Sequence, residues 1–202
     1  MKRRLLPLAL IITALAILSY LAGDKLILVA RIAQLYSAEP DQQLAMPVAG
    51  VSKDKVNDSW HAPRSAGERQ HEGQDIFAAR GTPVLSATNG YVVSVAENKL
   101  GGRTISVVGA GGRIYYYAHL DQYVDDMSVG KQVTPETVLG YVGTTGNAAG
   151  TPPHLHFGVY SSSGAINPLP LLSDRPEVKT APAKNEIQRK RPASKRRPSS
   201  AK

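Results

Sequence analysis

The stretch Pro153-His154-Leu155-His156-Phe157 carries two of the five histidines of this 202-residue chain. In a β-strand, side chains two positions apart point to the same face of the sheet. A strand here would present the imidazoles of His154 and His156 side by side and turn Leu155 into the core. The stretch therefore predicts a strand that carries two adjacent imidazoles on one face.

A second polar segment, His71-Glu72-Gly73-Gln74-Asp75, lies upstream. An extended backbone would set His71 and Asp75 on one face. The helical zinc motif with two histidines four residues apart does not apply, because the fifth residue is Asp75 and because Gly73 disfavours a helix. If the fold joins the two segments, two histidines and Asp75 form a three-ligand site with one position left for water, which is typical of catalytic zinc.

Each segment also has a simpler interpretation when it is taken alone. The upstream segment would be a polar turn, and His154 with His156 would be a hydrogen-bonded pair on a strand surface. Together, three histidines and an aspartate within apolar strands would be costly to bury without a metal. Strand spacing does not decide whether His154 or His156 is the metal ligand.

Two further histidines have weaker patterns. His119 ends the run 114–119, where alternation places Tyr115, Tyr117 and His119 on one face. A single, partly buried and hydrogen-bonded side chain is the simplest expectation for it. His61 has no partner by spacing. We expect it in a loop, where it is also a candidate to line a substrate groove.

Short apolar segments predict an all-β domain. Turn residues predict hairpins at Asn89-Gly90 and at residues 109–112. No window of residues 60–170 has a helical repeat, so the class is a small antiparallel sandwich or partly open barrel. A glycine-rich loop, residues 143–153, leads directly into His154 and is a candidate binding loop. The expected strands are residues 83–88, 91–95, 104–108, 113–120 and 138–142.

The N-terminal residues 1–37 predict a membrane anchor and a juxtamembrane helix. Lys2, Arg3 and Arg4 precede residues 5–22, which carry no charge and approach the length that spans a bilayer. A cleaved signal peptide is the alternative, but its candidate cleavage sites place Tyr20 or Tyr36 where a small residue is needed. We therefore expect a single-pass protein of the bacterial cytoplasmic (inner) membrane, with its folded domain outside, in the periplasm.

The remaining boundaries follow from composition. Residues 38–57 are polar and rich in turn residues, and predict a linker or a strand that leads into the domain, which we place at 58–173. Residues 174–202 have almost no apolar side chains and predict a disordered basic tail. Ten Lys/Arg and three Asp/Glu of the tail account for seven of the eight net positive charges of the chain.

The charge of the tail limits the partners that we expect. We expect attraction to anionic wall polymers or lipid head groups. Nucleic acid is not expected, because an exported domain seldom meets it. The chain has no cysteine, which excludes disulfides and cysteine-ligated metal.

Three motifs in this order resemble the lysostaphin/LytM family of zinc endopeptidases. They are Arg69-x-His71-x-Gly73-x-Asp75, Ala118-His119-Leu120 and His154-x-His156-Phe157. Three further segments are similar to the family: the glycine-rich loop, Asn167-Pro168 and residues 81–84. The whole resemblance covers roughly residues 58–172. It implies an all-β domain with one zinc ion in an open groove, and hydrolysis of peptide bonds in cross-links or stem peptides of bacterial cell-wall peptidoglycan.

By motif, the resemblance assigns the zinc ligands to His71, Asp75 and His156. It assigns the two catalytic histidines that do not bind metal to His119 and His154. Zinc would activate water and polarise the scissile carbonyl, and the free imidazoles would move protons.

The chain departs from the family pattern in one respect. Some members carry a tyrosine shortly before the first histidine, where it stabilises the oxyanion, and no tyrosine precedes His71 within the domain. Arg64, His61 or a loop group would have to substitute. The alternative function is a non-catalytic envelope scaffold that activates another cell-wall hydrolase, although relatives with that role typically lack ligands.

Overall fold

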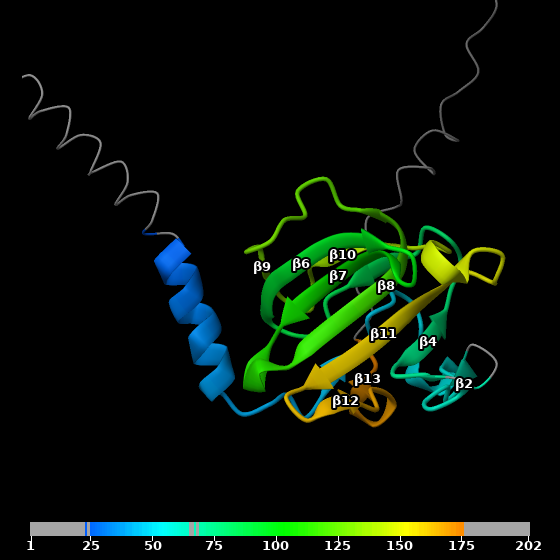
Figure 1. Ribbon diagram of the computed structural model, residues 1–202, viewed down its shortest axis with the longest axis horizontal. Helices are drawn as coiled ribbons and strands as arrows, with labels where there is room; N and C mark the ends of the chain where they lie inside the picture. The colour runs from blue at the N-terminus through cyan, green and yellow to red at the C-terminus, as the bar shows by residue number, and fades with distance from the viewer. Residues whose placement is uncertain (1–22, 24, 65–66, 68, 176–202) are drawn as a thin grey trace, which may run out of the picture.

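The computed structural model describes residues 23, 25–64, 67 and 69–175 of the chain. A helix, residues 25–37, precedes a domain built mostly from β-strands (Figure 1). The strands are β1 (Leu44–Ala45), β2 (Pro63–Arg64), β3 (Arg69–Gln70), β4 (Gln74–Phe77), β5 (Pro83–Leu85), β6 (Gly90–Asn98), β7 (Gly102–Val108), β8 (Ile114–Tyr123), β9 (Gln132–Val133), β10 (Val138–Val142), β11 (His154–Ser161), β12 (Gly164–Ile166) and β13 (Leu172–Ser173). Short 3-10 helices lie between them: η2 (Lys53–Lys55), η4 (Ala110–Gly112), η5 (Gly146–Ala148) and η6 (Leu169–Leu171).

Within the described residues, nine strands form the main antiparallel sheet, whose central order is β12-β11-β8-β7-β6-β9. Strand β4 pairs with β11, while β10 joins β8 to β5. This order does not return to its first strand, so the sheet is not a closed barrel. The all-β class expected from the sequence is confirmed.

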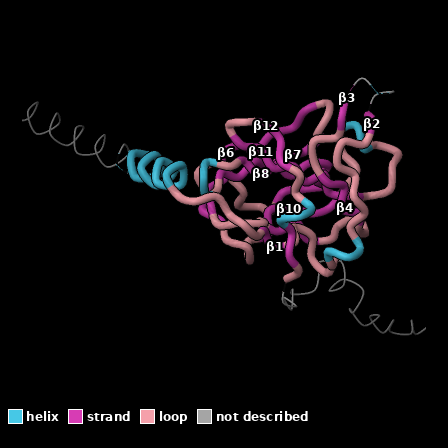
Figure 2. Tube along the Cα trace, turned by 90° about the horizontal axis from the view of Figure 1, so that it is seen from below, coloured by secondary structure: helices cyan, strands magenta, loops and turns pink. Residues whose placement is uncertain are grey.

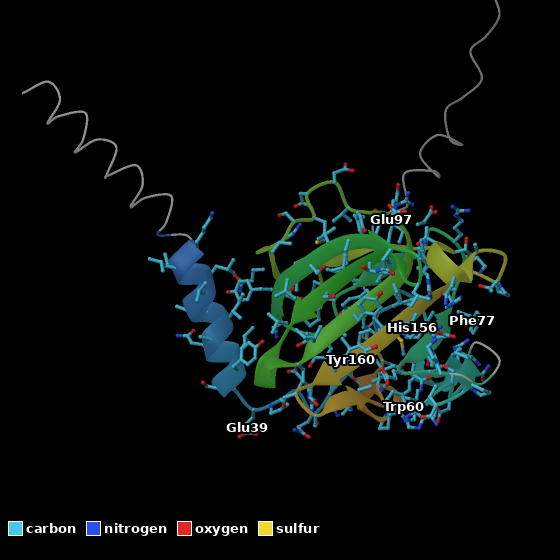
Figure 3. All side chains as sticks on the ribbon, in the orientation of Figure 1. Glu39, Trp60, Phe77, Glu97, His156 and Tyr160 are labelled. Carbon is cyan, nitrogen blue, oxygen red and sulfur yellow. The ribbon has the colours of Figure 1, made fainter. Side chains whose placement is uncertain are left out.

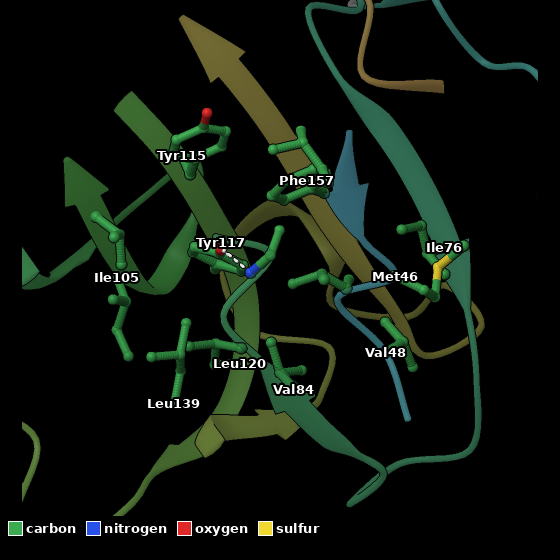
Figure 4. Packing of buried hydrophobic residues seen from close by; sticks show 14 of the residues in the cluster. Met46, Val48, Ile76, Val84, Ile105, Tyr115, Tyr117, Leu120, Leu139 and Phe157 are labelled. Atoms are coloured by element: carbon green, nitrogen blue, oxygen red, sulfur yellow. Dashed lines mark hydrogen bonds between the residues drawn. The ribbon is translucent and has the colours of Figure 1, made fainter. Parts of the chain in front are cut away.

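The core lies on one face of this sheet and is built by alternation along the strands. Tyr115 and Tyr117 of β8 are fully buried, and the ring of Tyr117 packs 5.2 Å from that of Phe157 on β11 (Figure 4). The Ala87 backbone N–H donates to the Tyr117 hydroxyl oxygen at 2.8 Å, which satisfies this buried polar atom. Because Leu155 and Phe157 face the core, His154 and His156 face the other side of β11.

The glycine-rich hairpin at residues 109–112 is confirmed, because Val108 pairs with Ile114 across it. Gly111 and Gly112 have φ of 69° and 65°, the left-handed region that glycine adopts without strain. The hairpin expected at Asn89-Gly90 is wrong, because β5 pairs with β10 whereas β6 pairs with β7 and β9. Gly90 instead permits a close approach of chains, since a Cβ there would lie 2.0 Å from the Val108 carbonyl oxygen.

The domain begins earlier than residue 58, the start expected from the sequence. Leu44, Met46 and Val48 are 0% exposed and belong to the hydrophobic core. Strand β1 pairs in parallel with β13, and the Met46 N–H donates to the Ser173 carbonyl at 2.9 Å. Much of segment 38–57, which the sequence predicts to be a linker or a strand leading into the domain, is therefore part of the fold. Residues 44–45 of this segment form such a strand, β1. The period-2 pattern of these apolar residues is short and is interrupted by Pro47.

The helix at residues 25–37 lies beside one end of the sheet in two perpendicular views (Figures 1 and 2). Leu28, Ile32 and Leu35, which share one helical face, are its partly buried apolar residues. In the part of the chain that the structure describes, no helix combines the length and the apolar character needed to cross a membrane. The expected spanning segment, residues 5–22, and most of the expected tail, residues 176–202, lie outside the described residues.

The fold also extends beyond residue 173, where the sequence places its end. The Arg175 guanidinium donates to the backbone carbonyl oxygens of Met46, Ser86 and Pro135. Burial lowers the pKa of Arg175, because shielding from water disfavours the charged form of the guanidinium. These bonds fasten the last residues of the domain to its N-terminal segment and to the core.

Arg175→Ala is expected to lower the free energy of unfolding by about 2–3 kcal/mol, because several carbonyls lose a charged donor. Urea unfolding of the variant and the parent chain measures this difference. Arg80→Ala is the matched control, because the ion pair of Arg80 with Asp121 is largely exposed and is expected to contribute no more than about 1 kcal/mol. Equal losses of unfolding free energy in the two variants would show that the hydrogen bonds of Arg175 stabilise the domain no more than an exposed ion pair does.

Candidate active site

Strand pairing brings the three expected metal ligands together. Asp75 on β4 is the register partner of His156 on β11, and His71 lies in the turn that connects β3 to β4. His71 Nε2 lies 2.8 Å from His156 Nδ1 and 3.1 Å from Asp75 Oδ1. His156 Nδ1 lies 3.3 Å from Asp75 Oδ1. These residues form a candidate metal site, with one ligand atom from each.

The shape of this cluster fits a zinc ion. Tetrahedral zinc with bonds of about 2.0–2.2 Å places its ligand atoms about 3.3–3.6 Å apart. The separations in the cluster, 2.8, 3.1 and 3.3 Å, run from the lower end of this range to about half an ångström below it. Two imidazole nitrogens and one carboxylate oxygen are also a ligand set of catalytic zinc, with a fourth position open to the groove.

Neighbouring groups fix the orientation of His71 and Asp75. His71 Nδ1 donates to the Ser59 carbonyl at 2.7 Å, so Nε2 carries the lone pair that a metal needs. The Asp75 N–H donates to Ser59 Oγ at 3.0 Å, and the Arg64 guanidinium pairs with Asp75 Oδ2. Arg64, named from the sequence as a possible oxyanion group, therefore holds the second oxygen of a candidate ligand.

Ser59 is held in turn by Gln74, a fully buried polar residue. The Ser59 N–H donates to Gln74 Oε1 at 3.0 Å, and Gln74 Nε2 donates to Asp58 Oδ1 at 2.9 Å. This network ties the segment before β2 to β4. Sequence reasoning missed Ser59 and Gln74, because their role depends on contacts between segments and not on a local pattern.

The electrostatics of the cluster favour an ionised Asp75 carboxylate beside a neutral His156 imidazole. Burial alone would raise the pKa of Asp75, but the neighbouring rings of His156 and His71 outweigh it and hold that pKa below its usual value. Burial lowers the pKa of His156. A carboxylate and neutral imidazoles are the protonation states that metal ligands require.

Gly73 has a steric role between the two upstream ligands. A Cβ at this position would lie 2.6 Å from His156 Cε1 and 2.8 Å from the Phe157 carbonyl oxygen. A methyl group there would therefore push the His156 ring out of the ligand cluster. This contact explains in physical terms why the motif holds a glycine between His71 and Asp75.

Gly73→Ala is expected to weaken zinc binding by about 10–100-fold, the loss typical when a ligand loses its correct orientation. Competition of the variant and the parent chain with a chromogenic chelator measures the affinity. Circular dichroism is the control for folding. Parent-like zinc affinity in a folded variant would show that the ring of His156 has more room than the structure indicates.

His154 and His119 stand beside the ligand cluster with their Nδ1 atoms engaged. His154 Nδ1 donates to the Pro152 carbonyl and His119 Nδ1 donates to the Thr145 carbonyl, each at 2.9 Å. A carbonyl can only accept, so in the neutral ring Nε2 is the basic nitrogen of each side chain. The two rings lie 5.0 Å apart, and burial lowers the pKa of His119 to about 4. His119 is thus a neutral proton acceptor at neutral pH.

His119 does not lie on the face that alternation predicts. Tyr115 and Tyr117 face the core, but His119 has φ of 64° and lines the groove. The expectation that these three side chains share a face is wrong, because the positive φ interrupts the alternation of β8. The Thr145 hydroxyl, which donates to the Leu120 carbonyl at 2.9 Å and accepts from the Arg103 N–H at 2.9 Å, stabilises this irregular turn.

A groove of about 450 Å³ contains these groups. Its lining includes Tyr116 on β8 and Tyr160 on β11, which sequence reasoning did not connect with the site. Figure 3 shows Tyr160 and His156 along the same strand. The Tyr160 hydroxyl donates to the Glu72 carbonyl at 3.2 Å. His61 is not among the lining residues and stacks instead on Trp60, with ring centroids 4.5 Å apart.

A family model described as peptidase family M23 matches residues 69–168, a range that contains all five expected site residues. This domain belongs to peptidase family M23. The resemblance to lysostaphin and LytM is thereby confirmed. The individual roles of His71, Asp75, His119, His154 and His156 remain predictions that the geometry of the M23 domain supports.

Two curated relatives and one solved structure illustrate the similarity. The L-Ala–D-Glu endopeptidase of Bacillus subtilis is 34% identical over 138 residues, which are 63% of this chain and 42% of the relative. Lysostaphin of Staphylococcus simulans is 35% identical over 108 residues, 50% of this chain and 21% of the relative. The catalytic domain of S. simulans lysostaphin superimposes with a TM-score of 0.50 at 29% identity, covering 58% of this chain and 92% of that domain. The chain thus spans less than half the length of these curated relatives.

Proposed function

We propose that the M23 domain is a zinc-dependent endopeptidase that hydrolyses peptide bonds in bacterial cell-wall peptidoglycan. The observation that carries this proposal is the convergence of His71 Nε2, Asp75 Oδ1 and His156 Nδ1 within 2.8–3.3 Å in a groove that two further histidines line. The names of the relatives support a peptide substrate, since the B. subtilis protein is an L-Ala–D-Glu endopeptidase.

In this mechanism His71, Asp75 and His156 hold the zinc ion. Zinc bound there would supply Lewis-acid chemistry, activating water near neutral pH and polarising the scissile carbonyl. His154 and His119 accept a proton from the attacking water and return one to the leaving amine through Nε2, because backbone carbonyls occupy both Nδ1 atoms. Tyr116, whose ring centroid lies 6.1 Å from that of His156, is the groove hydroxyl suited to stabilise the developing negative charge in place of the missing upstream tyrosine, because the Tyr160 hydroxyl already donates to the Glu72 carbonyl.

The cellular setting is part of the same proposal. Residues 5–22 would anchor the chain in the inner membrane and keep the domain in the periplasm, where peptidoglycan lies. The basic residues of 174–202 would attract anionic wall polymers or lipids. The complete set of three ligands and two further histidines favours an enzyme over a non-catalytic scaffold, since a scaffold has no need of either.

The full chain should release peptides from isolated sacculi, and a chelator should abolish the release. Restoring zinc should restore it, because hydrogen bonds from the surrounding protein, and not the metal alone, orient His71 and Asp75. Mass spectrometry of the released fragments identifies the bond that is cut. A zinc-loaded chain that releases nothing from several types of sacculus would contradict the enzyme assignment and favour the scaffold.

A further inference from the structure

The helix at residues 25–37 exposes an apolar surface that the domain does not cover. Leu26, Ile27 and Val29 are 68%, 52% and 63% exposed. The domain covers the side of the helix where Leu28, Ile32 and Leu35 are partly buried, so that Leu26 points away from it and Ile27 and Val29 lie on the two flanks. Contiguous exposed apolar side chains on one element indicate a surface that contacts a partner or a membrane.

The loop before β9 continues this apolar surface. Val129 is 63% exposed, and it lines a cleft of about 650 Å³ together with Ile27 and Leu28 of the helix. Gly130 lies so close to the helix that a Cβ there would be 3.0 Å from Leu28 Cδ2. We call Leu26, Ile27, Val29 and Val129 the helix–loop face.

Basic side chains line the cleft that Ile27 and Val129 of the helix–loop face share. Lys25, Arg31 and Lys131 line the cleft together with one acidic residue, Asp126, which pairs with Lys131. The cleft therefore carries a net positive charge. Exposed apolar groups flanked by Lys and Arg are typical of helices that lie in the headgroup layer of anionic membranes.

The position of the helix in the chain indicates that the headgroup layer is the partner that contacts the helix–loop face. The uncharged run 5–22 ends three residues before Lys25, and three residues span at most about 10–11 Å. The headgroup layer on each side of a bilayer is about 5–8 Å thick. If the run crosses the membrane, the first turn of the helix begins within or at the edge of the headgroup layer.

We propose that the helix–loop face rests on the anionic headgroup layer of the membrane. The proposal rests on the membrane anchor in the proposed function and not on the peptidase chemistry. The helix lies at one end of the molecule and β2, beside the groove, at the opposite end (Figures 1 and 2). Contact through the helix–loop face would therefore turn the groove away from the membrane and towards the wall.

The chain has no native cysteine, so Val129→Cys can carry a single environment-sensitive fluorophore. Leu100→Cys is the matched control, because Leu100 is 53% exposed and lines the groove. The full chain is reconstituted in vesicles of phosphatidylcholine with phosphatidylglycerol. The emission of the Val129 label should shift to shorter wavelength and be quenched by lipids that carry a quencher near the headgroup. The Leu100 label should show neither effect.

Similar behaviour of the two labels, or failure of the chain to float with the vesicles, would overturn the proposal. A concentration-dependent shift at Val129 without lipid would instead identify a second copy of the chain as the occupant. Arg31→Glu should reduce the shift on anionic vesicles and leave peptide release from solubilised wall fragments unchanged. The label reports membrane contact whether or not the chain is an active peptidase, so failure of the two proposals is distinguishable.

Discussion

His156→Ala is expected to lose its bound zinc and at least ~100-fold of its peptide-releasing activity, because losing groups that merely orient a ligand already costs about 10–100-fold. His156 Nδ1 is the ligand atom contributed by β11, 2.8 Å from His71 Nε2. Without it, one imidazole and one carboxylate remain, and they cannot complete the three-ligand set. Zinc content after gel filtration and peptide release from sacculi measure the two effects.

His61→Ala is the matched control for this experiment. It makes the same substitution at an exposed histidine that stacks on Trp60 and does not line the groove. The control should keep both zinc and activity. If His156→Ala retained a full equivalent of zinc, the assignment of this histidine as a ligand would be wrong.

The second large effect is expected at His119. His119→Ala should keep zinc but lose about 10²–10⁴-fold in turnover, the usual contribution of a general acid or base. Its ring lies beside the cluster, with a centroid 5.9 Å from that of His156, and Nδ1 is bonded to the Thr145 carbonyl. This placement supports the prediction that His119 transfers a proton and does not bind the metal.

Zinc content and kcat of His119→Ala are measured on the same preparation. Comparison with His156→Ala separates the two roles, because only the ligand variant should be empty of metal. A His119 variant that contained no zinc would contradict this division. A variant with parent-like kcat would remove His119 from the proton-transfer path.

The ligand cluster could be predicted from the sequence because its members follow strand geometry. The His-x-His pattern of β11 and the even spacing of His71 and Asp75 each place side chains on one face, and antiparallel pairing then sets His156 opposite Asp75. Spacing alone did not separate His156 from His154. That distinction came from the resemblance to the family, and the structure is consistent with it, since His154 Nε2 lies farther from Asp75 Oδ1, at 3.9 Å.

Other parts of the fold could not be predicted because they depend on contacts between distant segments. The positive φ of His119 interrupts the alternation of β8, so a period-2 pattern places its side chain on the wrong face. Leu44 and Met46 belong to a period-2 pattern that is too short to predict a strand by itself, and they become core residues only by packing beside β13. Arg175 looked like part of a basic tail, yet three backbone carbonyls hold it within the domain.

X-ray absorption spectroscopy of the zinc-loaded full chain counts the imidazoles around the metal and so distinguishes the ligand histidines from the proton-transfer histidines. We expect two imidazole nitrogens at about 2.0–2.1 Å and one carboxylate oxygen at about 2.0–2.2 Å, with further oxygen from solvent. These ligands would be His71, His156 and Asp75. A zinc ion with three or more imidazoles would show that His154 or His119 also binds the metal, and would contradict the division between ligands and proton-transfer groups.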